Sequence, residues 1–217
     1  MTGATKNVKR NVKNSAAKKP QARSGETRRL LLEAAWEVFV REGYERAQVD
    51  QIAAAAGRTK GAVYGHFKDK EDLFLALFEE RSKRDMEAVV ARMGAGTDKA
   101  ANLAALRSFF RDLASDKSWA ILTLEFKLYS LRYPEVRRRL RRAYQQTHPP
   151  DMKAKLREVF GARSPGEGLE IEGSVAALSP ILCALALESV LEPRLFSRAK
   201  LPLYLERLFD ALIMAED

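Results

Sequence analysis

The sequence predicts an all-α protein of about nine helices. Apolar residues recur at steps of three and four along most of the chain, which is the period of an amphipathic helix. No stretch shows the alternation of apolar and polar residues that marks a half-buried strand. The composition agrees, because Ala, Leu, Arg and Glu are common, whereas Gly and Pro number only 12 and 8 among 217 residues.

Start and stop signals divide the N-terminal part of the chain into four helices. Gly43 ends the first, Gly57 separates two short helices, and Thr59 is placed to cap the second of these. Asp69 can cap the long helix that follows, with Asp72 three residues later in the position of a capping box. The predicted helices span about 26–42, 49–56, 59–67 and 70–93.

The same signals predict five further helices in the rest of the chain. Pro134 and Pro202 suit the first turns of two of them, where an amide hydrogen has no partner within the helix. Pro180 falls inside a third, which it is expected to kink or restart. These helices are expected over about 98–115, 118–132, 134–161, 170–191 and 201–215.

One segment has the layout of a helix-turn-helix that reads DNA. Its sequence, QVDQIAAAAGRTKGAVYGHF over 48–67, has small residues that let two short helices cross closely. Val63 and Phe67 are four residues apart and define the buried side of the second helix. The residues left on its exposed side, where they can meet a DNA groove, are Lys60, Gly61 and Tyr64.

The residues from Glu26 to about Phe78 resemble the TetR family of repressors. The family signature is Gly-Tyr after the first helix and then Lys-Gly-x-x-Tyr-x-His-Phe-Lys-x-Lys; here these are Gly43-Tyr44 and KGAVYGHFKDK. Order and spacing make this match more specific than a helix-turn-helix pattern alone. The resemblance implies a DNA-binding domain over 25–70, and a helical ligand-binding and dimerisation domain over 71–217.

The resemblance also implies which residues meet DNA. Gly65 stands where a larger residue is common, and Gln48 stands where Ser or Thr is usual, so direct base contacts are expected to be few. The implied DNA-binding residues are Gln48, Arg58, Thr59, Lys60, Gly61, Tyr64, His66 and Lys70.

The basic charge of the chain lies mostly in its first 24 residues. They carry seven Lys and Arg and no acid, which leaves only +2 of the formal net charge of +9 for the rest. Such a segment buries too little apolar area to order itself, so we expect residues 1–24 to form a disordered tail. It is either a solvated leader or an arm that adds phosphate contacts.

Aromatic side chains gather between residues 109 and 144, in the domain that the resemblance assigns to ligand binding. Glu125 has apolar neighbours at helical spacing, and an acid on such a buried face needs a partner. That partner is either a cationic or hydroxylated ligand, or an internal arginine such as Arg107, Arg111 or Arg132. The candidate pocket residues are Phe109, Phe110, Trp119, Leu122, Glu125, Phe126, Tyr129 and Tyr144.

In the resembled family the last two long helices join two subunits. Apolar residues of the predicted helices at 170–191 and 201–215 suit a four-helix interface, with core packing inside one chain as the alternative. The candidate interface residues are Ile181, Leu185, Leu191, Leu205, Leu208, Phe209 and Leu212.

We therefore expect a repressor that binds a palindromic operator as a homodimer and leaves it when a small-molecule effector binds. A ligand-independent architectural DNA-binding protein is the alternative. No enzyme, cofactor or metal site is expected: there is no phosphate-binding glycine loop, His66 lacks a constellation of partners, and the lone Cys183 suits the core. We also expect a cytoplasmic location without membrane contact, since no unbroken apolar run is long enough to span a bilayer and no secretory signal is present.

Overall fold

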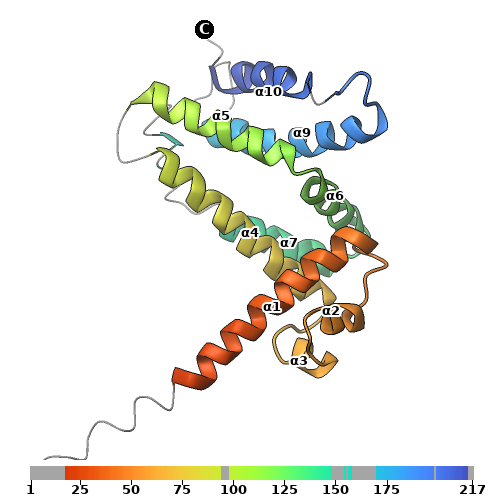
Figure 1. Ribbon diagram of the computed structural model, residues 1–217. Helices are drawn as coiled ribbons and strands as arrows, with labels where there is room; N and C mark the ends of the chain where they lie inside the picture. The colour runs from red at the N-terminus through yellow and green to blue at the C-terminus, as the bar shows by residue number, and fades with distance from the viewer. Residues whose placement is uncertain are drawn as a thin grey trace, which may run out of the picture.

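The computed structural model confirms the all-α class in the residues that it describes, namely 18–93, 98–147, 154, 156–157, 170–197 and 199–214. The helices are α1 (Lys18–Glu42), α2 (Val49–Ala55), α3 (Lys60–Tyr64), α4 (Lys70–Met93), α5 (Lys99–Ser115), α6 (Lys117–Arg132), α7 (Pro134–Thr147), α9 (Ile171–Leu191) and α10 (Leu201–Phe209), followed by a π-helical turn at Asp210–Met214. Figure 1 shows α1–α3 at one end of the molecule, α5, α9 and α10 at the other, and α4 running between them.

The first helix is longer than predicted. α1 begins at Lys18, so residues 18–24 are helical rather than part of a disordered tail. Pro20 falls in the first turn, where proline is tolerated, and it is followed by the good helix formers Gln21, Ala22 and Arg23. The rest of the predicted tail, residues 1–17, lies outside the described residues.

The start of α4 is capped as predicted and is also held by α7. Asp69 Oδ1 accepts the Asp72 amide hydrogen at 2.6 Å, and Asp72 Oδ2 accepts that of Lys68 at 3.0 Å. Arg139 of α7 donates two hydrogen bonds to Asp69, both at 3.0 Å, and a third to Asp72 at 3.2 Å. A bidentate pair of this kind fixes orientation as well as distance, so α7 is anchored beside the N-terminus of α4.

The structure bears on two of the later predictions. α7 spans Pro134–Thr147, and the rest of the helix predicted over 134–161 lies mostly outside the described residues, of which 154, 156 and 157 are helical. α9, by contrast, runs without a break through Pro180, which is exposed. A restart at this proline, one of the two predicted outcomes, is therefore not seen.

α9 is also apolar and long enough, by length and composition, to cross a membrane. Its window Gly173–Leu191 has 19 residues and a mean hydropathy of 1.9, and 33% of it is buried. This helix was not singled out from the sequence, because Pro180 and Glu188 interrupt its apolar residues. In the structure α9 packs against α5, α6 and α10, and it leaves much of its apolar surface uncovered.

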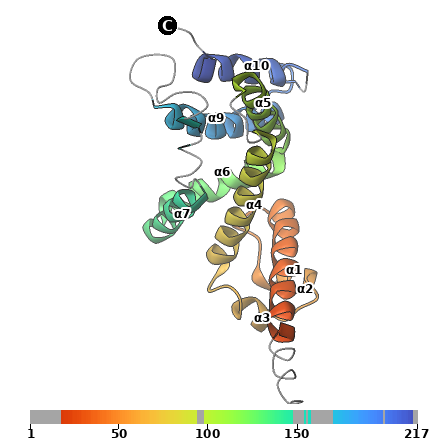
Figure 2. The same ribbon diagram turned by 90° about the vertical axis from the view of Figure 1, so that its left-hand side faces the viewer.

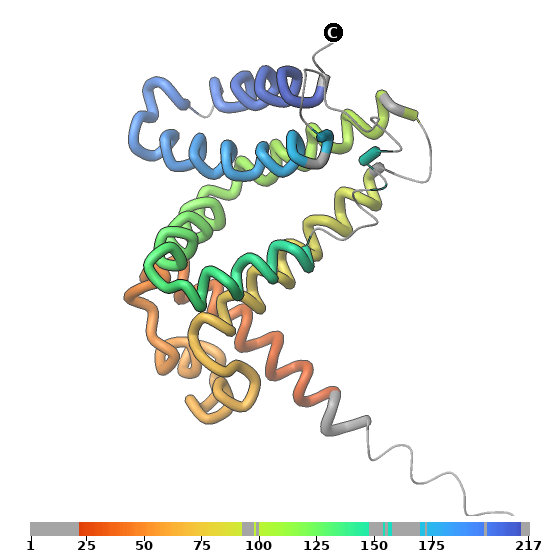
Figure 3. The backbone as a smooth tube through the Cα atoms, turned by 180° about the vertical axis from the view of Figure 1, so that it is seen from behind, coloured from red at the N-terminus to blue at the C-terminus, as the bar shows by residue number. Residues whose placement is uncertain are grey.

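The core consists of two main clusters of buried residues. One joins α1, α2, α3 and the first half of α4 to Trp119, Leu122 and Phe126 of α6 and to three residues of α7. The other joins Val89, near the end of α4, to α5, α9 and α10. The first cluster includes residues from both sides of residue 70, where the predicted DNA-binding domain ends. The first three helices therefore share their core with α6 and α7. Figures 2 and 3 show α4 passing through both regions.

Candidate nucleic-acid interface and internal cavity

α2 and α3 form a compact helix pair whose caps come from their own sequence. Gln51 Oε1 accepts the Gln48 amide hydrogen at 3.0 Å, and Thr59 Oγ1 accepts that of Ala62 at 3.2 Å. Gly57 has φ +61°, a left-handed conformation that favours glycine, and it makes the turn between the helices. The predicted turn at Gly57 and the predicted cap at Thr59 are therefore present.

The exposed side of α3 is the predicted one. Val63 and Phe67 are 1% and 3% exposed, whereas Tyr64 is 49% exposed and Lys60 and Gly61 face solvent. Figure 2 shows α3 at the opposite end of the molecule from α9 and α10. Gln48, Arg58 and Thr59 are exposed as well, and His66 is partly exposed. α3 is shorter than predicted because Gly65, a poor helix former, follows Tyr64.

Lys60 has an internal partner that the sequence reasoning missed. Its ammonium forms an exposed ion pair with Asp50 of α2 at 2.9 Å. The hydrogen bond to Asp50 raises the pKa of Lys60, so the side chain remains a cation. The signal was available in principle, because Asp50 and Lys60 occupy the first turns of two helices that cross.

Lys70 does not face outward, although it is among the DNA-binding residues predicted from the sequence. Its ammonium donates to the carbonyl oxygens of Tyr44, Glu45 and Ala47 at 2.9, 3.0 and 3.1 Å. It also lies 4.7 Å from the centre of the Tyr44 ring. These bonds use all three donor hydrogens, and burial lowers the pKa of Lys70. Lys70 therefore holds the turn between α1 and α2 in place instead of presenting its charge to DNA.

Glu125 has a partner that neither interpretation of the sequence named. Its Oε2 accepts the main-chain amide hydrogen of Tyr44 at 2.8 Å. Arg107 and Arg132, two of the candidate arginines, form ion pairs with Asp210 and Glu45 instead. Gly43 has a φ of +77°, and a Cβ atom on it would lie 3.1 Å from Glu125 Oε2. Both the left-handed backbone and the close contact favour glycine at this position.

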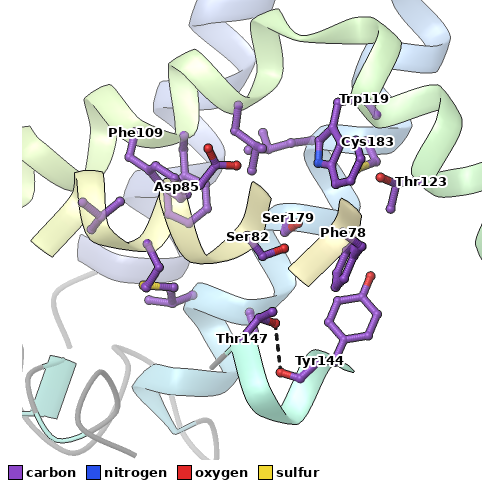
Figure 4. Close-up of a pocket in the computed structure, with 18 of the residues that line it drawn as sticks. Phe78, Ser82, Asp85, Phe109, Trp119, Thr123, Tyr144, Thr147, Ser179 and Cys183 are labelled. Carbon is purple, nitrogen blue, oxygen red and sulfur yellow. Dashed lines mark hydrogen bonds between the residues drawn. The ribbon is translucent and has the colours of Figure 1, made fainter. Parts of the chain in front are cut away.

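A cavity of about 770 Å³ lies among α4, α5, α6, α7 and α9. Figure 4 shows aromatic rings on its walls together with a few polar groups. Four of the predicted pocket residues line it: Phe109, Phe110, Trp119 and Tyr144. Cys183, predicted to be core, is 6% exposed and also lines it, and burial raises the pKa of its thiol.

The other four predicted pocket residues do not line this cavity. Leu122 and Phe126 are core residues, 2% and 1% exposed, on the side of α6 that faces α1 and α4. Glu125 and Tyr129 lie with Leu122 along a second, more polar hollow next to the turn at 43–47. Phe126 follows Trp119 by two turns on the same side of α6, and the sequence did not indicate how far along the helix the cavity extends.

Sequence reasoning missed the contribution of α4 and α9 to the cavity. α4 contributes Ser82 and Asp85, and α9 contributes Ser179. A carboxylate at 85 close to the apolar residues Met86 and Val89 was the signal that could have drawn attention to α4. Within the described part of the chain, no group of three His, Cys, Asp or Glu side chains could hold a metal ion.

The apolar surface at the end of the molecule also differs from the prediction. Leu205 and Phe209 are 8% and 3% exposed, so they belong to the core of one chain and not to an interface. Leu185, Leu208 and Leu212 are partly buried against the same core cluster, and Ile181 is also partly buried. The large apolar side chains exposed in this region are Val190, Leu191, Leu195, Leu203 and Tyr204.

Comparison with known proteins places these features in a family. The family model for bacterial regulatory proteins of the tetR family matches residues 31–77. The regulator TtgW of Pseudomonas putida is 40% identical over 90 residues, which are 36% of this chain and 67% of TtgW. SrpR, also of Pseudomonas putida, is 40% identical over 90 residues as well, and the match spans 42% of its length.

Solved structures share the fold over nearly the whole chain. FadR of Bacillus subtilis in complex with stearoyl-CoA has a TM-score of 0.66 at 24% identity, covering 87% of this chain and 98% of FadR. A regulator of Saccharomonospora viridis in complex with choline has a TM-score of 0.65 at 20% identity, covering 86% and 96% of the two chains. Because the helix-turn-helix, the family model and the relatives agree, the chain belongs to the TetR family of transcriptional regulators.

Proposed function

We propose that this protein is a repressor that binds a palindromic operator as a homodimer and releases it when a small molecule enters the cavity. The observation that carries the DNA-binding part is the division of α3 into two sides. Val63 and the following Phe67 hold the helix to the core, which leaves Lys60, Gly61 and Tyr64 together on its open side. A lysine, a side-chain-free position and a tyrosine hydroxyl suit a groove edge and its phosphates.

Gly61 supports this proposal because the fold itself does not require glycine there. A Cβ atom at 61 would meet nothing closer than Thr59 Oγ1 at 3.7 Å, which is an ordinary contact. Glycine in a helix costs about 0.5–1 kcal/mol relative to alanine. A close approach of the DNA duplex to α3 would explain why glycine stands at this position, although it lowers stability and the surrounding structure does not require it.

The exposed apolar residues of α9, α10 and the loop between them support a dimer. Val190, Leu191, Leu195, Leu203 and Tyr204 leave an apolar surface at the end of the molecule remote from α3. A two-fold axis that passes through this surface parallel to the long axis of the subunit would place two copies of α3 at the same end of the assembly. Two such helices read successive major grooves when they lie about 34 Å apart.

The cavity supports regulation by a small molecule. Its volume lies within the range of about 300–1,000 Å³ that is usual for ligand sites. The stearoyl-CoA and choline complexes of the structural neighbours are consistent with a ligand in this domain. The walls that α4 and α6 provide connect the cavity to the turn at 43–47, because Lys70 of α4 and Glu125 of α6 both bind that turn. Movement of either helix would displace α2 and α3.

The test is selection of bound sequences from a randomised duplex pool at near-physiological salt. The wild-type chain is expected to enrich an inverted repeat, and the double variant Lys60→Ala with Tyr64→Ala is expected to lose it. Gly61→Ala serves as a fold-neutral variant, which should unfold at a higher temperature and yet bind the selected site more weakly. Salt-sensitive binding without a motif, unchanged in these variants, would instead support a ligand-independent architectural protein.

A further inference from the structure

The described residues that line the cavity carry negative charge and no positive charge. Among its described lining residues, Asp85 of α4 is the one with a charged side chain. The lining around it is mainly apolar and includes the rings of Phe109, Trp119 and Tyr144. Figure 4 shows Asp85 on one side of the site and Thr123 on the other.

The carboxylate of Asp85 is poorly compensated. No described residue donates a hydrogen bond to it, and its ion-pair contact is with Arg81 Nε, 3.9 Å away. The same guanidinium binds Asp116 through Nη2 and lies over the rings of Trp36 and Trp119 at 5.1 and 4.8 Å, while its Nε, the atom nearest to Asp85, makes no hydrogen bond. The Asp85 side chain is 31% exposed, and its partial burial raises its pKa against the opposing charges of Arg81 and Arg84.

A second polar group in the cavity also lacks a partner. Thr123 is 6% exposed, and its Oγ1 is buried without a hydrogen bond. A buried hydroxyl in this condition costs free energy unless a ligand or a water molecule binds it. Thr123 and Asp85 thus provide two polar positions in an otherwise mainly apolar cavity.

We propose that the cavity binds a hydrophobic monocation, an alkyl or aryl ammonium whose positive group lies at Asp85 and whose apolar part lies among the aromatic rings. A neutral apolar molecule would leave Asp85 further desolvated without compensation. An anion would add a like charge beside it. A cation neutralises the carboxylate and gains from the faces of nearby aromatic rings. This inference deepens the proposed function and rests on the cavity being its effector site.

Three probes of equal chain length and different charge test the proposal on the full chain without DNA: decyltrimethylammonium, decanoate and 1-decanol, each below the concentration at which it aggregates. Binding is measured by calorimetry and by quenching of tryptophan fluorescence, to which Trp119 in the cavity wall contributes. Asp85→Asn removes the charge with little change in shape. Glu87→Gln makes the same charge change on the exposed side of the same helix and is the matched control.

The wild-type chain is expected to bind the ammonium about tenfold more tightly than either other probe. Asp85→Asn should lose about tenfold for the ammonium alone, and Glu87→Gln should behave as wild type. Equal or tighter binding of decanoate or decanol by the wild-type chain would overturn the proposal, and this comparison does not depend on any variant. A folded Asp85→Asn variant with undiminished ammonium binding would overturn it as well.

Operator release is measured separately, by fluorescence anisotropy of the selected duplex with and without decyltrimethylammonium. Binding of the ammonium that depends on Asp85 but leaves the duplex bound supports the inference about the cavity, while it contradicts effector release. If the wild-type chain enriches no motif in the pool selection, the DNA-binding proposal is contradicted, while the result on ligand class is unaffected.

Discussion

Glu125, in the middle of α6, accepts the main-chain amide hydrogen of Tyr44 at 2.8 Å, across 81 residues of chain. The Tyr44 ring packs edge-on against Phe126 of the same helix, with the ring centres 4.7 Å apart. Trp119 and Thr123, which come earlier in α6, line the cavity. A single helix therefore contacts both the cavity and the turn that leads into α2.

Removing this acceptor tests its role. Glu125→Ala leaves the Tyr44 amide hydrogen unpaired at a partly buried position, so we expect the free energy of unfolding to fall by about 2 kcal/mol. Operator affinity should fall too, because the turn at 43–47 loosens. Denaturant unfolding and anisotropy measure the two effects. Glu135→Ala, which removes an exposed acid of α7, is the control and should change neither.

Lys70 holds the same turn from α4. Lys70→Met keeps the aliphatic stem and removes the ammonium, which leaves three carbonyl oxygens without their donor. We expect a loss of about 2 kcal/mol in the free energy of unfolding. Lys68→Met, at an exposed position two residues away, should cost much less. If both variants unfold alike, the three bonds do not stabilise the turn.

The ion pair between Lys60 and Asp50 predicts an effect of salt on DNA binding. Asp50→Asn frees the Lys60 ammonium and removes a negative charge from the DNA-facing side, so operator affinity should rise. Lys60→Met should instead lower the slope of log K against log salt concentration by about 1. Titrations at several salt concentrations separate the two. An Asp50→Asn variant that binds no better than wild type would show that the pair opens without cost when DNA binds.

The pair between Arg139 and Asp69 predicts how stability depends on pH. Burial opposes ionisation of Asp69, but hydrogen bonds from Arg139 and the Asp72 amide hold its pKa below the ordinary 3.8. The resulting stabilisation is present above pH 3.8 and is lost as the pH falls through the lowered pKa. Arg139→Gln should therefore lower the free energy of unfolding at neutral pH and differ less from wild type in acid, below that pKa. Arg137→Gln, exposed on the same helix, should track wild type in both conditions.

The unpaired hydroxyl of Thr123 predicts a stabilising substitution. Thr123→Val keeps the shape and removes a buried polar atom without a partner, so the free energy of unfolding should rise by about 1 kcal/mol. Thr147→Val is the contrast, because its Oγ1 donates to the Tyr144 carbonyl oxygen at 3.1 Å, and that variant should be destabilised. Thermal unfolding without ligand decides between them, and a destabilised Thr123→Val would indicate that the hydroxyl is satisfied in solution.

Local features were predicted well because local physics sets them. Helix period and caps were sufficient to place Val63 inside and Tyr64 outside, since both depend on residues within one or two turns. The same reasoning placed Trp119 at the cavity but also placed Phe126 there. These residues are seven positions apart and lie on the same side of α6, two turns from each other. Periodicity shows which side of a helix is buried without showing what each turn along that side meets.

The sequence by itself determined the helical class, the helix-turn-helix with its exposed α3 residues, and the resemblance to the TetR family. Each of these depends on the spacing of residues that are close together in the chain. Only the tertiary structure decided that Lys70 binds three carbonyl oxygens, that Glu125 binds the Tyr44 amide, and that Asp85 faces the cavity. A charged side chain pairs with whatever the fold brings near it. Those partners come from segments far away in the chain, so no local pattern contains them.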